Sequence, residues 1–93
     1  MNVYIASIGN KYKIERYSGY VPLKLDHRNT LQGKVYYDTQ NTVKIETTLS
    51  YDVGQKISIG GYPIGGKKFR LLEVSITDNP VLKDSQIIER RSK

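Results

Sequence analysis

The stretch GQKISIGGYPIGGKKFRLLEVSI, residues 54–76, decides the fold. Ile57 and Ile59 alternate with polar neighbours, which is the period-2 pattern of a half-buried β-strand. Glycines and Pro63 interrupt the segment that follows, and the pattern of a strand returns over residues 69–76. Two strands joined by a Gly/Pro-rich connection predict a β-hairpin with a wide loop, and this hairpin is the centre of the predicted domain.

Two further pairs of strands are predicted on the N-terminal side of this hairpin. Residues 3–8 and 11–17 are separated by the turn signal Gly9-Asn10, and they predict an N-terminal hairpin. A helical turn over the first of these segments is the competing interpretation. Residues 33–37 and 42–49 predict the next pair, because apolar and polar residues alternate in the second of them and one face is solvated.

Residues 18–32 are the least regular part of the sequence and predict a long loop that leaves the sheet. A short edge strand is expected within residues 81–88, and the charged tail at residues 89–93 is expected to fray. Six to seven short strands predict an all-β protein, either a small β-sandwich or a partly open β-barrel. We expect residues 1–93 to form a single domain.

Composition favours a polyanionic partner. Fifteen Lys and Arg against nine Asp and Glu give a net charge of +6, which favours contact with nucleic acid through counterion release. Eight tyrosines suit half-buried strand positions and interfaces. The absence of cysteine excludes disulfides and thiolate chemistry. The sequence shows no membrane segment and no signal peptide, so a cytoplasmic start is expected.

The sequence predicts no enzyme. His27 is the only histidine, and no nucleophile or orienting group stands at a spacing that would support it as a general base. We interpret it as a solvated loop residue. With no cysteine, one histidine and scattered acids, no metal site and no cofactor are predicted.

Basic residues mark both predicted hairpins and stand among tyrosines. Such a pattern is typical of a surface that binds a single nucleic-acid strand, as in oligonucleotide-binding barrels, although edge-strand lysines also prevent aggregation between sheets. The candidate contacts for nucleic acid are Lys11, Lys13, Arg16, Lys67, Lys68 and Arg70.

The order of features is similar to that of the head-closure or head–tail joining (connector) proteins of tailed bacteriophages. The resemblance lies in residues 54–59 (GQKISI), the glycine loop, and residues 69–74 (FRLLEV), which follow the order strand, glycine turn, strand. Residues 4–9 (YIASIG) and 12–16 (YKIER) also resemble the way such chains begin. Together these segments cover about half of the chain.

The resemblance implies a structural virion protein, which forms a homo-oligomeric ring between portal and tail and is assembled in the host cytoplasm. The long loop at residues 18–32 would face the DNA channel of this ring, and it is expected to be mobile and to gate the channel. The expected partners are other copies of the chain, the portal or adaptor and tail proteins, and DNA in the channel. Two alternatives remain open: a small nucleic-acid-binding β-barrel of the OB or SH3-like kind, and a small mobile-element protein that binds a host protein. The implied channel-loop residues are Lys24, Asp26, His27 and Arg28, and the implied subunit-interface residues are Tyr62, Pro63, Ile64, Ile87 and Ile88.

Overall fold

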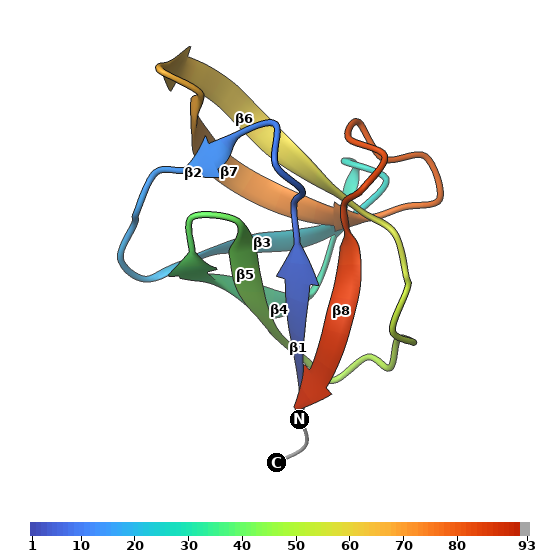
Figure 1. Ribbon diagram of the computed structural model, residues 1–93. Coiled ribbons are helices and arrows are strands. Elements are labelled where there is room, and N and C mark those ends of the chain that lie inside the picture. The colour runs from blue at the N-terminus through green and yellow to red at the C-terminus, as the bar shows by residue number, and fades with distance from the viewer. Residues whose placement is uncertain (92–93) are drawn as a thin grey trace.

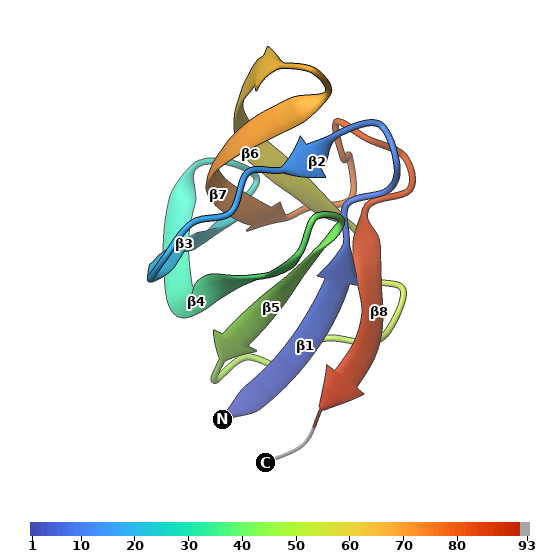
Figure 2. The same cartoon turned by 60° about the vertical axis from the view of Figure 1, so that its left-hand side comes forward.

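The computed structural model describes residues 1–91, and within that range it contains strands and no helix. All strands belong to one open, mixed sheet that curves around the core (Figures 1 and 2). The predicted all-β domain is confirmed, with eight strands where six to seven were expected. The strands are β1 (Asn2–Ser7), β2 (Lys13–Ile14), β3 (Tyr20–Leu25), β4 (Asn29–Thr39), β5 (Thr42–Thr47), β6 (Ile57–Gly65), β7 (Lys68–Ile76) and β8 (Gln86–Arg91).

Strand β7 joins the two parts of the sheet. One of its edges pairs with β6, and the other pairs with β2 near its start and with β3 at its end. From β3 the order continues through β4, β5 and β1 to β8. The β2–β7 and β3–β7 pairs are parallel. The start of β8 also approaches the segment before β6, because Gly54 N–H donates to the Ile87 carbonyl over 2.8 Å and Ile87 N–H donates to the Gln55 carbonyl over 2.9 Å.

Alternating side chains fill the core, as the sequence pattern predicts. In β5, Val43, Ile45 and Thr47 are buried, whereas Lys44 and Glu46 between them are partly exposed. Every strand contributes to the same apolar cluster, which forms because burial of apolar surface is the main favourable term in folding. Its members are Tyr4, Ala6, Ile8, Ile14, Leu23, Val35, Val43, Ile45, Ile57, Ile59, Phe69, Leu71, Val74, Ile76 and Ile87.

The predicted N-terminal hairpin is wrong. Strand β1 pairs with β5 and β8, and β2 pairs in parallel with β7. Residues 3–6 of β1 are all buried, so both faces of this strand are covered and both of its edges need partners. The turn at Gly9, whose φ is 84°, carries the chain across to β7 and does not fold it back on β1.

The predicted long loop at residues 18–32 is also wrong. This segment contains β3 and the start of β4, which pair with each other on either side of a tight turn. Asp26 and His27 have φ angles of 50° and 59°, and Arg28 N–H donates to the Leu25 carbonyl over 3.0 Å. Two successive positive φ angles match a type I′ hairpin turn. Pro22 is tolerated in β3 because the ladder is irregular between Pro22 and Lys24.

The central hairpin is present, but its wide loop is not. Strand β6 continues through the glycine-rich segment, and the turn consists of Gly66 and Lys67, with φ angles of 57° and 65°. This is again the geometry of a type I′ turn. The ladder is irregular where Gly60 lies opposite Glu73 and Gly61 lies opposite Leu71. Leu72 has no partner on β6 at this bulge, and it is 52% exposed.

The C-terminal edge strand lies further along the chain than expected. Strand β8 includes residues 89–91, and Arg91 lies opposite Val3 of β1. The prediction of a frayed tail is therefore wrong for these three residues. Residues 92–93, the rest of that predicted tail, lie outside the described residues.

Candidate functional site

Four of the predicted basic contacts meet at one end of the molecule. Lys13 of β2 lies opposite Lys68 of β7, and Lys13 N–H donates to the Lys67 carbonyl over 2.8 Å. Lys11 lies two residues before Lys13, and all four lysines are exposed. We call Lys11, Lys13, Lys67 and Lys68 the lysine end. Sequence reasoning named these residues but assigned them to two separate hairpins, because the parallel β2–β7 pair leaves no local signal.

The two arginines of the predicted set are engaged elsewhere. Arg70 forms an ion pair with Glu15, with 2.8 Å between Nη2 and Oε1. The hydrogen bond to Glu15, and then the one to Tyr62, raises the pKa of Arg70 above its usual value. The Arg16 guanidinium lies over the Tyr37 ring, 5.8 Å from its centroid. Arg70 therefore offers less free positive charge to a phosphate than the lysines do.

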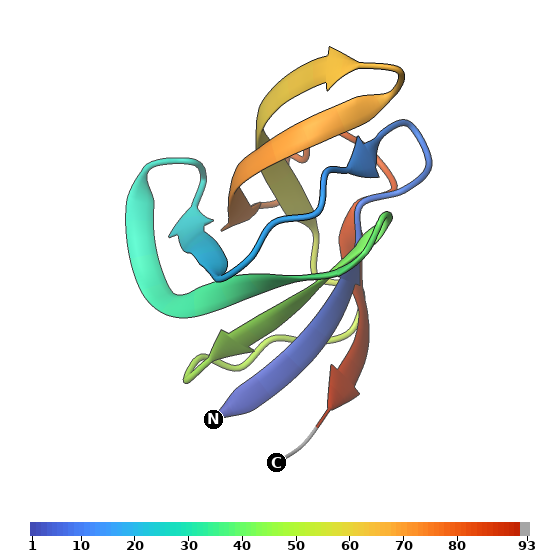
Figure 3. The same ribbon diagram turned by 90° about the vertical axis from the view of Figure 1, so that its left-hand side faces the viewer.

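The tip of the β6–β7 hairpin exposes apolar side chains. Tyr62 is 45% exposed, Ile64 is 37% exposed, and Pro63 between them is also exposed. Figures 1 and 3 show the tip of this hairpin at one end of the molecule, and the start of β1 and the end of β8 at the opposite end. We call residues 62–64 the hairpin tip. It coincides with three of the predicted subunit-interface residues.

The other two predicted interface residues separate from each other. Ile88 is 45% exposed on β8, whereas Ile87 is fully buried in the core. The prediction is therefore wrong for Ile87, because its side chain points inward beside Ala6 of β1. Ile88 lies at the irregularity in the β1–β8 ladder, where it has no partner on β1.

The predicted channel residues surround the β3–β4 turn, and a buried carboxylate connects them to β7. His27 Nδ1 contacts Glu73 Oε1, and Lys24 Nζ lies 4.0 Å from Glu73 Oε2. His27 N–H also donates to Ser75 Oγ over 2.8 Å. Asp26 N–H donates to the Ile76 carbonyl over 3.1 Å. We call Lys24, His27, Glu73 and Ser75 the turn clamp.

The turn clamp corrects the interpretation of His27 as a solvated loop residue. Its side chain is 38% exposed, whereas that of Glu73 is only 10% exposed. Ser75 is fully buried and lies 3.5 Å from the Glu73 carboxylate, so its hydroxyl is not accessible to a substrate. The cluster holds the turn against β7. Sequence reasoning missed Glu73, although a carboxylate inside the apolar run LLEVSI is the signal that could have found it.

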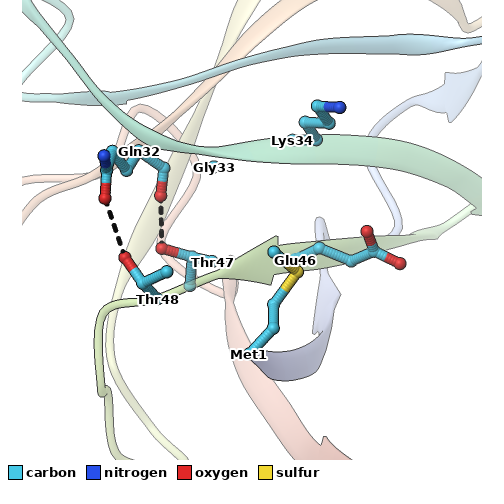
Figure 4. A pocket seen from close by; sticks show the side chains of 7 residues that line it. All are labelled: Met1, Gln32, Gly33, Lys34, Glu46, Thr47 and Thr48. Carbon is cyan, nitrogen blue, oxygen red and sulfur yellow. Dashed lines mark hydrogen bonds between the residues drawn. The ribbon is translucent and has the colours of Figure 1, made fainter.

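A shallow hollow is lined by Met1, by residues 32–34 of β4 and by residues 46–48 at the end of β5 (Figure 4). Its volume is about 310 Å³. Thr48 Oγ1 donates to Gln32 Oε1 over 3.0 Å and closes one side, while the Lys34 and Glu46 side chains extend away from this contact (Figure 4). The lining residues are Met1, Gln32, Gly33, Lys34, Glu46, Thr47 and Thr48.

Neither a metal centre nor a membrane helix is found in the part of the chain that the structure describes. Within residues 1–91, no three His, Asp or Glu side chains gather as metal ligands would. The same range holds no helix long and apolar enough to cross a membrane. Comparison with protein-family models, with curated proteins and with solved structures finds no match to this chain.

Proposed function

We propose that the chain is a structural virion protein of a tailed bacteriophage, a ring-forming head-closure or head–tail adaptor subunit. Its hairpin tip packs against the next copy in the ring. The resemblance of residues 54–59 and 69–74 to connector proteins supports the choice of family. The observation that carries the proposal is the apolar hairpin tip, which points away from the core of its own chain.

The hairpin tip suits insertion into a neighbour. Tyr62 and Ile64 are both partly exposed, and burying the rest of each side chain would contribute about 1 kcal/mol. The tight turn at Gly66 and Lys67 keeps the two strands of the hairpin together, so little conformational entropy is lost on docking. Pro63 has no N–H, which disfavours simple edge-to-edge strand pairing and favours contact through side chains.

The arrangement of exposed apolar residues favours a ring over a two-fold dimer. The hairpin tip and Ile88 lie on different surfaces of one chain, on β6 and on β8. A contact between two different surfaces is heterologous, and it closes into a ring when the rotation between subunits permits. We propose that the tip of one subunit covers the β8 surface around Ile88 of the next.

The expected mobile gate does not carry over from the resemblance. Residues 20–39 form a paired hairpin, and the turn clamp holds its turn against β7. In a ring, this turn would be a fixed part of the channel wall carrying Asp26 and Arg28. Opening and closing would then require movement of whole subunits.

Native mass spectrometry of the full chain tests this proposal. We expect a ring of defined copy number, and we expect Tyr62→Ser/Ile64→Ser to shift it to the monomer. The matched control is Val53→Ser/Val81→Ser, because these residues are 59% and 71% exposed but lie off the tip. A wild-type chain that stays monomeric at all accessible concentrations contradicts the proposal, as does equal dissociation of the control.

The lysine end favours a second candidate function, a small nucleic-acid-binding domain. Four exposed lysines from two distant segments converge there, which is an arrangement suited to phosphates. The test is fluorescence anisotropy with labelled duplex DNA over a series of salt concentrations. Lys67→Gln/Lys68→Gln should weaken binding and lower the slope of log K against log salt by about 0.9 for each phosphate that the variant no longer neutralises. An unchanged slope excludes this site.

A further inference from the structure

The outer face of β3, β4 and β5 carries tyrosines with a lysine over each ring. Tyr20 lies opposite Tyr36, and Tyr36 lies opposite Lys44, so the three side chains form one row across three strands. Lys34, two residues before Tyr36, lies on the same face. We call Tyr20, Lys34, Tyr36 and Lys44 the tyrosine face. We propose that it binds an unpaired nucleic-acid strand.

The rings are placed for stacking with a ligand. Tyr20 is 54% exposed and stands outside the core cluster, so folding leaves much of its ring surface free. Its centroid is 6.1 Å from that of Tyr36, with 59° between the ring planes. Two adjacent tilted rings present a stepped aromatic surface, and every base has a flat face that can stack on it.

The lysines place positive charge over the rings. A base that stacks on the same face of Tyr20 would take the place of the Lys34 ammonium. Lys34 Nζ is 4.8 Å from the Tyr20 centroid, and Lys44 Nζ is 5.1 Å from the Tyr36 centroid. These cation–π contacts hold each ammonium next to an aromatic surface. Lys44 also lies 3.8 Å from Glu46, so its charge is partly balanced, whereas Lys34 has the Tyr20 ring as its neighbour. The Lys34 ammonium is therefore close enough to a base stacked on Tyr20 to form an ion pair with the adjacent phosphate.

The hollow at the end of this face provides a place for an adjoining base. Lys34 belongs to both, so the hollow and the tyrosine face are continuous. Its volume of about 310 Å³ is at the lower end of the range for small-ligand sites, about 300–1,000 Å³. Gln32 uses its side-chain carbonyl to accept from Thr48, which leaves the amide N–H groups free to donate to a base.

An unpaired strand fits this surface better than a duplex does. Stacking on Tyr20 and Tyr36 requires bases whose faces are open, whereas a duplex presents phosphates and groove edges. The lysine end, by contrast, offers charge for phosphates, and the tyrosine that lies under a lysine there, Tyr12, is partly buried. The inference does not depend on ring formation, because the tyrosine face lies within one chain.

Fluorescence anisotropy with the full chain and a labelled oligo(dT) tests the inference. We expect binding that weakens with salt, and we expect Tyr20→Leu to weaken it about tenfold or more, the effect of removing one base stack. Tyr20→Phe should retain the binding, because the ring remains. Lys34→Gln should weaken it and reduce its salt dependence. The matched controls are Lys83→Gln and Val81→Ser, which change exposed residues between β7 and β8, and both should bind as the wild type does.

Four outcomes would overturn the inference. The first is the absence of binding by the wild-type chain at low salt. The second is Tyr20→Leu binding as tightly as the wild type. The third is a loss of binding confined to Lys68→Gln and Lys67→Gln, which would move nucleic acid to the lysine end. A duplex of the same length that competes as well as the single strand would also contradict stacking on the tyrosine face.

Discussion

In the turn clamp, we expect the loss of His27 and the loss of Glu73 to have unequal effects on the free energy of unfolding. Glu73 is buried, while its partners His27 and Lys24 are 38% and 30% exposed at their side chains. Removing the partner of a buried charge costs more than removing the charge itself, because the remaining group keeps its desolvation penalty. His27→Asn should therefore destabilise the protein more than Glu73→Gln does. Asparagine is the right replacement because it tolerates the positive φ of 59° at this position.

The magnitudes follow from the exposure of each group. In Glu73→Gln the freed His27 and Lys24 return to water, so we expect a cost of about 1–2 kcal/mol in the free energy of unfolding. In His27→Asn the carboxylate keeps only Lys24 at 4.0 Å and the Ser75 hydroxyl at 3.5 Å, and we expect about 3 kcal/mol. In the double variant His27→Asn/Glu73→Gln, no buried carboxylate is left without a partner. This variant should be more stable than His27→Asn alone by about 1 kcal/mol.

Urea unfolding at neutral pH, followed by circular dichroism, measures all three variants. A difference of about 1 kcal/mol corresponds to about 4–8 °C in Tm for a domain of this size, so thermal unfolding provides an independent check. Lys24→Gln is the matched control, and its cost should be the smallest because the ion pair is long. Equal and additive effects of His27→Asn and Glu73→Gln would refute the reasoning, since they would mean that the Glu73 carboxylate is solvated without His27.

Further substitutions test the core packing, the backbone at two glycines and the buried Tyr17. Leu23→Ala should cost about 2–5 kcal/mol, whereas Leu25→Ala, which starts 40% exposed, should cost much less in the same denaturation assay. Gly61→Ala should lower the free energy of unfolding by about 3 kcal/mol, because the φ of Gly61 is 149° and a Cβ there would overlap the Arg70 carbonyl. Gly19→Ala should lower it by about 1–2 kcal/mol, because the φ of Gly19 is 72° but its surroundings are open. Burial raises the pKa of Tyr17, so stability should be full below the usual value of 10.0 and fall as pH rises above it. Tyr17→Phe should reduce that alkaline dependence in urea midpoints measured against pH, and Tyr51, whose pKa burial also raises, should keep part of it.

The sequence predicts individual strands better than their partners. The alternation around Ile45 and around Ile57 is local, and it identifies β5 and the central hairpin correctly. Strand pairing is decided by which buried faces meet across the whole chain. Nothing near Ile14 indicates that it pairs with Phe69, and nothing near Tyr4 indicates pairing with β8. The N-terminal hairpin is therefore a reasonable local prediction that long-range pairing overturns.

The amino-acid composition of the two tight turns does not identify them in the sequence. Asp26, His27 and Lys67 all adopt positive φ angles, although residues other than glycine seldom do so. Residues 18–32 therefore resemble a loop in sequence, although they form a hairpin. The turn clamp is missed for a related reason. His27 and Glu73 are 46 positions apart, so their contact depends on the parallel pairing of β3 with β7.

The pairing of β1 with β8 determines how this domain can be connected to other polypeptide. Val3 and Arg91 are opposite each other, and Figure 2 places the two strand ends together, away from the hairpin tip. A fluorescent protein or affinity tag that is joined before β1 or after β8 would extend from the same end of the domain and leave the hairpin tip unobstructed. A short linker between these two ends, with a new opening at Gly66, would give a circular permutant that cuts the β6–β7 turn while keeping every strand.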